Sequence, residues 1–243
     1  MGALFAALDG TLLNALTVLI GATVGTLAGN RLPARMHDSL FGVLGLFVVL
    51  IGLQDALGTQ NALVVLAALL LGLLLGEALD LEGALERFGD RVQRAFARPG
   101  SRVSEAFVTS TLVFCVGPLS ILGALDNGLN GDISKLAVKA VLDGFGALAF
   151  SAALGWGVYL SISVILLYQG AISLSAHLIA PLLRPGSPAI IELTATGGLI
   201  LVAIGLKLLK IRDLRVANLL PALVLAPALV AALALARQAR VLP

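Results

Sequence analysis

Residues 61–80 read NALVVLAALLLGLLLGEALD, and from 62 to 76 they carry no polar side chain. About 20 apolar residues in a helix are enough to cross the hydrocarbon core of a bilayer, which is about 30 Å thick. The rest of the chain is similar, because 59% of its residues are hydrophobic and only 12% are charged. A soluble protein has about 25% charged residues. The sequence therefore predicts an all-α integral membrane protein.

The pattern of residues 61–80 recurs along the chain, and about eight segments have the length and apolarity of a membrane span. They are 11–29, 40–58, 61–80, 104–125, 133–154, 157–181, 189–206 and 215–236. Gly155 and Gly157 flank Trp156, which favours a tight turn at a headgroup layer. The first residues lack the basic region and cleavage site of a signal peptide, so we expect the first span to be retained.

Lysine and arginine are divided unequally between the two sides that these segments define. Eleven lie on one side, in the loops around 31–35, 87–102 and 207–215, and four lie on the other. The positive-inside rule makes the first side the cytoplasm and predicts that both termini are outside. The net charge of +2 is too small to suggest nucleic acid as a partner.

An amphipathic helix is predicted over 82–98, where Leu85, Phe88, Val92 and Phe96 recur at helical spacing between charged residues. One interpretation is a helix that lies in the headgroup layer of the bilayer and is anchored there by arginine. The alternative is a docking site for a cytosolic partner.

An internal repeat relates the two ends of the chain. GLFVVLIGL at 45–53 and GLILVAIGL at 198–206 are identical at six of nine positions, at a shift of 153 residues. The loop 53–60 has no lysine or arginine, whereas its counterpart 206–213 has three, so the two copies would run in opposite directions. We therefore predict an inverted repeat of three spans around a central helix pair. The chain is predicted to divide into a first three-helix half at 1–80, the amphipathic basic segment 81–103, the central helix pair 104–156 and a second three-helix half at 157–243.

Polar residues are concentrated in the central pair, where 114–146 read FCVGPLSILGALDNGLNGDISKLAVKAVLDGFG. Pro118 follows Gly117, and it predicts a kink or break in the fourth span because proline has no N–H and clashes with the preceding turn. Freed backbone groups at membrane depth are tolerated only against protein or a water-filled cavity. The segment DNGLNGD has the composition of a turn, with Asp132 capping the next helix. It does not match a calcium-binding loop.

Asp143 lies about 16 Å beyond Asp132 along the fifth span, which is close to the bilayer midplane. An ionisable group at that depth costs about 3 kcal/mol or more and marks a functional site. Lys139, at i−4, is one candidate partner, although this order is the weaker one for a helix pair. Another helix or a bound solute is the alternative, and a purely structural Lys139–Asp143 pair is also possible. Small residues after Asp143 would allow close helix packing.

Candidate residues for binding a solute or ion are therefore the polar side chains at membrane depth and in the central stretch. They are Asp143, Lys139, Asp126, Asn127, Asn130, Asp132, Asn14 and Asn218, with Gly117, Pro118, Gly128 and Gly131 as candidates for a helix break or gate. For Asn14 and Asn218 the favoured interpretation is hydrogen bonding between helices, and lining the site is the alternative. Glu192 is interpreted as structural, and Glu77 as a partner of a loop arginine. The sequence has no pattern typical of a metal site, a cofactor site or a catalytic nucleophile, so an enzyme is not expected.

The run LxxxGALDNGLNGDxxxLxxKAVLDGFGALAF, followed by GWG, resembles the YqgA/YdfK-like family of bacterial inner-membrane proteins of unknown function. The resemblance extends over the chain and includes Asn30-Arg31-Leu32-Pro33. Ala140 and Pro118 depart from the residues expected in that pattern. The resemblance implies a multi-pass protein of the bacterial inner membrane and implies no activity.

The function that these residues favour is secondary transport of a small polar or ionic solute, coupled to protons or ions. A channel would use the same polar stretch without alternating access. A structural or partner-binding membrane protein acting through the basic helix is a third hypothesis. Asp143 favours a cationic solute, whereas Lys139 and exposed helix N-termini favour an anion. The small-residue faces permit a homodimer.

Overall fold

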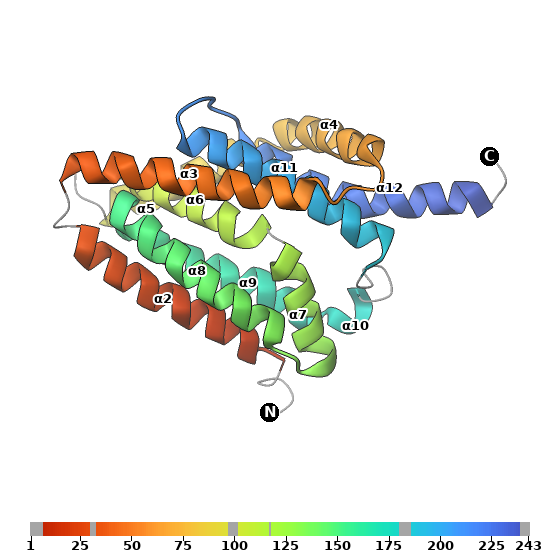
Figure 1. The fold of residues 1–243 in the computed structure, drawn as a ribbon, viewed down its shortest axis with the longest axis horizontal. Coiled ribbons are helices and arrows are strands. Elements are labelled where there is room, and N and C mark those ends of the chain that lie inside the picture. The colour runs from red at the N-terminus through yellow and green to blue at the C-terminus, as the bar shows by residue number, and fades with distance from the viewer. Residues whose placement is uncertain (1–6, 30–32, 97–101, 117, 180–185, 239–243) are drawn as a thin grey trace.

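The computed structural model describes residues 7–29, 33–96, 102–116, 118–179 and 186–238. Within these ranges the chain is helical and contains no strand (Figure 1). The helices are α2 (Asp9–Gly29), α3 (Ala34–Ala56), α4 (Ala62–Ala78), α5 (Leu81–Phe96), α6 (Val103–Val116), α7 (Pro118–Asn130), α8 (Ser134–Leu154), α9 (Tyr159–Leu174), α10 (Ala176–Ile179), α11 (Pro188–Leu208) and α12 (Pro221–Gln238), with 3₁₀ turns η1 (Trp156–Val158) and η2 (Val216–Leu219).

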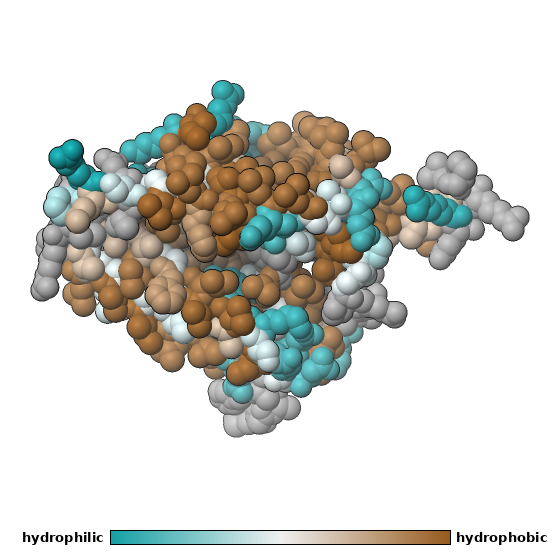
Figure 2. All heavy atoms as spheres, viewed as in Figure 1, coloured by the Kyte–Doolittle hydropathy of each residue, from teal (hydrophilic) through white to brown (hydrophobic). Residues whose placement is uncertain are grey.

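Five helical segments of the described chain are long and apolar enough to cross a membrane. They are Asp9–Gly29, Ser134–Leu154, Trp156–Leu174, Pro188–Leu208 and Val216–Arg237. A sixth is obtained if α6 and α7 form one span bent by 59°, while Gly42–Ala56 and Ala62–Ala78 are shorter apolar helices. Large apolar side chains such as Leu63, Leu70 and Leu74 are exposed. Figure 2 shows that hydrophobic residues cover much of the visible face. These are the properties of a membrane protein.

The core lies where α6, α8, α9 and α11 meet. Its largest fully buried members include Phe107, Phe114, Phe150, Ile165 and Ile200. Phe114 and Phe150 contact each other edge to face, with ring centroids 6.1 Å apart. A rigid apolar core beside α8 is what holds charged side chains on that helix at a fixed position.

Glycines allow α2 and α8 to pack side by side in parallel. A Cβ atom on Gly21 would lie 2.0 Å from the Gly144 carbonyl oxygen, one on Gly25 would lie 2.1 Å from that of Leu148, and one on Gly29 would lie 2.5 Å from that of Ala152. The three glycines are four residues apart and therefore share one face of α2. The expectation that small residues of the fifth span allow close packing is confirmed.

The antiparallel pair α3 and α11 also depends on glycine. Gly45 faces Gly205, and Gly52 faces Gly198, with every added Cβ atom closer than 3.0 Å to the opposite helix. Helices α4 and α12 meet in the same way, because a Cβ on Gly72 would lie 2.6 Å from Ala222 and one on Gly76 would lie 2.0 Å from the Asn218 carbonyl oxygen.

The predicted break in the fourth span is present. Helix α6 ends at Val116 and α7 begins at Pro118, and the two axes differ by 59°. Proline is well suited to the first position of a helix because its missing N–H would have no partner there. The Ser120 hydroxyl donates to the Phe114 carbonyl, 2.8 Å away, and so satisfies an acceptor left by the break. Gly117 lies outside the described residues.

The expected loop at 126–132 is wrong for most of its length. Helix α7 continues to Asn130, and only 131–133 form the turn, where Gly131 has φ +68°. Gly128 is therefore inside a helix rather than at a break. A Cβ atom on it would lie 2.1 Å from the Ser173 carbonyl oxygen, so this glycine allows α7 to approach α9. Composition predicted a turn, but packing of α7 against α9 extended the helix.

The predicted amphipathic helix is present as α5, and it packs against the protein. Phe88 lies 5.4 Å from Phe107 of α6, measured between ring centroids. The Glu82 carboxylate near the start of α5 accepts from Ala217 N at 2.7 Å and from Lys207 Nζ at 3.1 Å. Glu77 pairs with Arg215 at 3.1 Å, as expected of Glu77 and a loop arginine.

A candidate binding site at the centre of the helices

A buried ion pair lies in the middle of α8. Lys139 Nζ is 2.6 Å from Asp143 Oδ2, and the two residues are only 5% and 6% exposed. Asp143 is about 14 Å from the first residue of α8 at 1.5 Å per residue. The pair therefore lies deep inside the helix bundle, where an unpaired charge would be costly.

An amide of α2 bonds to this ion pair, and an amide of α9 bonds to that of α2. Asn14 of α2 donates from Nδ2 to Asp143 Oδ2 at 3.0 Å and to Gln169 Oε1 of α9 at 3.4 Å. Both amide side chains are fully buried. The structure thus brings together three of the predicted residues, Asn14, Lys139 and Asp143. We call these three and Gln169 the central cluster.

Some hydrogen-bond donors and acceptors of the central cluster have no partner among the described residues. Asn14 Oδ1 and Gln169 Nε2 are buried and have no hydrogen-bond partner, and the same is true of Thr11 Oγ1, one turn earlier on α2. Buried polar atoms are nearly always hydrogen-bonded in native proteins. The unused donors and acceptors beside the buried ion pair are therefore available to form hydrogen bonds with a ligand or water.

Gln169 was not among the sequence-based candidates. It carries no charge, and its helix has no charged residue, so only its presence as an amide in a membrane-length segment could have indicated a role. Cys115, at the end of α6, is a further neighbour, because it is close enough to Lys139 and Asp143 to interact with their charges.

Three other predicted residues hold helix ends rather than join the central cluster. Asn127 Oδ1 accepts from Gly10 N at the start of α2, 3.1 Å away, and Asp132 Oδ1 accepts from Ser134 N at the start of α8, 2.8 Å away. Asp126 forms an ion pair with Lys135. The hydrogen bonds from Ser134 hold the pKa of Asp132 below its usual value. Asn130, the last of the predicted group, is exposed at the end of α7.

Asn218 does not join the central cluster. It lies in η2, at the start of the apolar segment Val216–Arg237, and its Oδ1 accepts from Glu82 N, 2.8 Å away, at the start of α5. The 3₁₀ turn before α12 thus brings this amide to the end of another helix.

Glu192 is structural, as interpreted, but its partners could not be predicted. The carboxylate is 1% exposed and accepts from Thr59 Oγ1 at 2.6 Å, Gln60 N at 2.9 Å and Asn61 N at 2.8 Å. It therefore fastens the turn between α3 and α4 to the start of α11.

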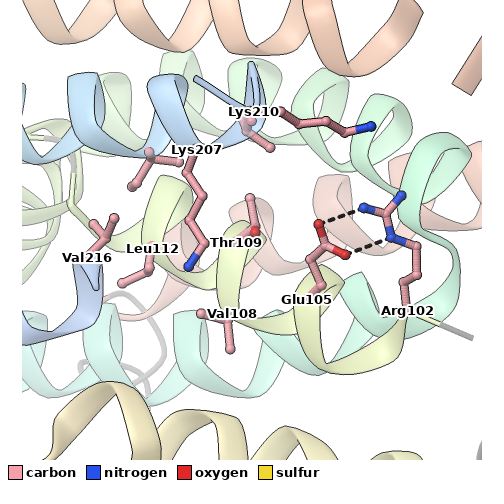
Figure 3. Close-up of a pocket in the computed structure, with 10 residues that line it drawn as sticks. Arg102, Glu105, Val108, Thr109, Leu112, Lys207, Lys210 and Val216 are labelled. Atoms are coloured by element: carbon pink, nitrogen blue, oxygen red, sulfur yellow. Dashed lines mark hydrogen bonds and ion pairs between the residues drawn. The ribbon is translucent and has the colours of Figure 1, made fainter. Parts of the chain in front are cut away.

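The end of the bundle that lies opposite Glu192 is basic. A hollow there is lined by Arg102 and Glu105 at the start of α6 and by Lys207 and Lys210 at the end of α11 (Figure 3). Arg102 forms two 2.7 Å bonds with Glu105, and Lys207 extends between the two helices toward Thr109 and Leu112. Loops far apart in the sequence thus place their cations together at one end.

Comparison with known proteins identifies the family. Residues 9–231 match the family described as "Protein of unknown function (DUF554)". The chain belongs to this family. The resemblance drawn from the GALDNGLNGD stretch is therefore confirmed, and the match includes every residue of the central cluster.

Two relatives of this DUF554 chain have names that state no activity. The "Uncharacterized protein YqgA" of Escherichia coli is 34% identical over 228 residues, which cover 92% of this chain and 96% of the relative. The "Uncharacterized membrane protein YdfK" of Bacillus subtilis is 28% identical over 225 residues, covering 91% and 95%. No solved structure matches the chain.

Proposed function

We propose that this chain is a secondary transporter of a small polar or ionic solute, and that the central cluster binds that solute. The observation that carries the proposal is the set of unused polar atoms around a buried ion pair. A pair that served only as glue would be expected to have its neighbours fully hydrogen-bonded. Asn14 Oδ1 and Gln169 Nε2 instead remain available to a ligand.

An inverted repeat of three helices supports alternating access as the mechanism. At the shift of 153 residues, Gly45 corresponds to Gly198 and Gly52 to Gly205. The contacts are crossed, Gly45 with Gly205 and Gly52 with Gly198, as two copies related by a two-fold axis would make them. Asn14 and Gln169 lie on α2 and α9, the first helices of the two halves, and they bond to each other. Transporters with such repeats bind solutes where the halves meet.

The membrane orientation belongs to the same proposal. Eight spans result if α3 and α4 cross the membrane and α6 with α7 counts as one bent span. The basic end in Figure 3 would then face the cytoplasm, with both termini outside the bacterial inner membrane. The name of the Bacillus subtilis relative supports a membrane location.

A ligand screen on the purified full-length protein tests this function. Wild type and Asp143→Asn would be heated in detergent with inorganic ions, amino acids, sugars and carboxylates at several pH values. A ligand at about one hundred times its dissociation constant adds about 2.7 kcal/mol of stability. We expect one solute class to raise Tm of the wild type and to leave Asp143→Asn unchanged. Asp126→Asn is the control and should respond as wild type does. A shift that persists in Asp143→Asn would contradict the proposed site.

A further inference from the structure

The hydrogen bonds of the central cluster leave oxygen atoms unused. The hydrogen bonds that Asp143 accepts from Lys139 Nζ, at 2.6 Å, and from Asn14 Nδ2, at 3.0 Å, both end on Oδ2. Asn14 Oδ1 has no partner among the described residues, nor has Thr11 Oγ1 on the same face of α2. Carboxylate, amide and hydroxyl oxygens are the ligands that hard cations prefer.

Groups that would attract an anion are already engaged. The first amide groups of α2 and α8 donate to Asn127 Oδ1 and Asp132 Oδ1, so neither helix start offers a free N–H at those positions. The Lys139 ammonium is held on Asp143. Gln169 Nε2 is the unused donor of the central cluster, and Asn14 Oδ1 is its unused acceptor. Thr11 Oγ1, one turn away on α2, can also offer an oxygen lone pair. Together with the carboxylate of Asp143, these oxygens favour a cationic solute.

We propose that a monovalent alkali cation displaces the Lys139 ammonium from Asp143, and that the protein exchanges this cation for a proton. The inference rests on the proposed transport function and names its solute. The ammonium occupies the position beside Oδ2 that a bound cation would take. The Lys139 ammonium would thus compete with the cation for the Asp143 carboxylate.

The exchange step balances in charge and atoms. The cation binds Asp143 and Asn14 Oδ1; one N–H bond of Lys139 breaks, and its proton leaves to water on the open side. Lys139 becomes a neutral amine, so the net charge of the site is zero before and after. When the site opens to the other side, the cation leaves and a proton from water restores the ammonium. A divalent cation would leave one positive charge uncompensated in a buried site, which is costly.

The titratable groups that face this pair come from few elements. Lys139 and Asp143 lie on α8, and Cys115 of α6 is close to both. The contributions of α2 and α9 to the hydrogen bonds are the uncharged amides Asn14 and Gln169. We therefore assign the exchanged proton to Lys139 rather than to a second carboxylate.

The test is cation-driven proton movement by the full-length protein in liposomes that contain a pH-sensitive dye. A pulse of LiCl, NaCl or KCl outside should make the interior alkaline, whereas choline chloride should not. Because one charge replaces another, clamping the membrane potential should not change the initial rate. In detergent, one proton should be released per cation bound, and the apparent Kd should rise tenfold for each unit by which the pH is lowered.

Lys139→Arg is the decisive variant. Arginine keeps the charge and can keep the ion pair, but it does not release a proton in proteins. We expect it to fold with wild-type Tm and to lose exchange completely. Lys139→Gln should bind the cation with no proton release and no pH dependence, and Asp143→Asn should bind none. Lys135→Gln, one turn earlier on α8, is the matched control and should exchange as wild type does.

Three results would overturn the inference. They are exchange by Lys139→Arg, cation binding by wild type without proton release, and no response to any alkali cation. If the cations are inert but another solute from the screen is transported and Asp143→Asn blocks it, the inference fails and the transport function stands. If no solute binds or moves, both fail.

Discussion

Three buried carboxylates lie at different positions along the helix bundle. Asp143 lies in the central cluster, Glu82 at the basic end and Glu192 at the opposite end, and each is at most 6% exposed. Glu82 and Glu192 accept from backbone amide groups as well as side chains, which completes the bonding of turns between helices. Asp143 differs because its described partners are all side chains. This difference separates the structural role of Glu82 and Glu192 from the proposed ligand-binding role of Asp143.

Glu192→Ala should lower the free energy of unfolding by about 3 kcal/mol, because it leaves the Gln60 and Asn61 amide groups without their acceptor in a partly buried turn. Glu192→Gln should cost about 1 kcal/mol, since its amide oxygen can still accept both bonds. Denaturant or thermal unfolding of the purified protein measures the difference. Equal losses in the two variants would show that the charge, not the hydrogen bonds, is what matters.

At the scale of single residues, the sequence predicted the roles of charged residues better than the roles of amide residues. Lys139 and Asp143 could be recognised because two ionisable groups at i and i+4 inside an apolar span are rare. Gln169 and Asn218 could not be placed, because an uncharged amide in an apolar segment has no preferred role. Only the packing decides that Gln169 meets Asn14 and that Asn218 meets the start of α5.

Glycine contacts set the spacing of the helices. Along α2, Gly21, Gly25 and Gly29 let the backbone approach α8 closely enough to bring Asn14 within 3.0 Å of Asp143. In lipid the hydrophobic effect does not hold helices together, so association depends on close packing. Glycine favours this packing because its small side chain lets two helix backbones come into contact. The central cluster therefore depends on a helix pair that tolerates no added atoms.

Gly25→Ala should destabilise the protein by about 1–3 kcal/mol, because the new Cβ atom would lie 2.1 Å from the Leu148 carbonyl oxygen and force α2 from α8. Gly42→Ala on α3 is the control, since a Cβ atom there meets nothing within 4 Å and alanine is the better helix former by about 1 kcal/mol. Thermal unfolding in detergent checks both. A destabilised Gly42→Ala, or an unaffected Gly25→Ala, would contradict the described packing.

Helices could be predicted more reliably than their ends. Apolar length located helices in the predicted segments, and five segments of the described chain are long and apolar enough to cross a membrane. Pro118 and Gly155 marked a break and a turn that are present. Turn composition failed at 126–130, where contacts of α7 with α9 keep Asp126 and Asn127 helical. Local preferences of polar residues were outweighed there by packing between distant segments.

The whole molecule has two chemically different ends. Arg102, Lys207 and Lys210 gather at one end, whereas the turn at 57–61 lies at the other, beside Glu192. If the basic end faces the cytoplasm, as proposed, the turns 57–61 and 209–215 lie on opposite sides of the membrane. The proposed alternating access between two inverted halves requires this arrangement.

Cysteine labelling in intact cells tests this orientation. In a Cys115→Ala background, Gly58→Cys should react with a membrane-impermeant maleimide from outside, and Arg212→Cys should react only after lysis. Both positions are exposed. Labelling of both cysteines from the same side would contradict the orientation and the opposed directions of the two halves.

The most direct test of the central claim is solute transport by the double variant Lys139→Met/Asp143→Leu in liposomes, with its Tm as the control for folding. Replacing a buried ion pair by apolar residues of similar size is often neutral or stabilising. If the central cluster binds the solute, Tm should be unchanged or higher and transport should be abolished. Transport at the wild-type rate by the folded double variant would make Lys139 and Asp143 structural and would contradict the account.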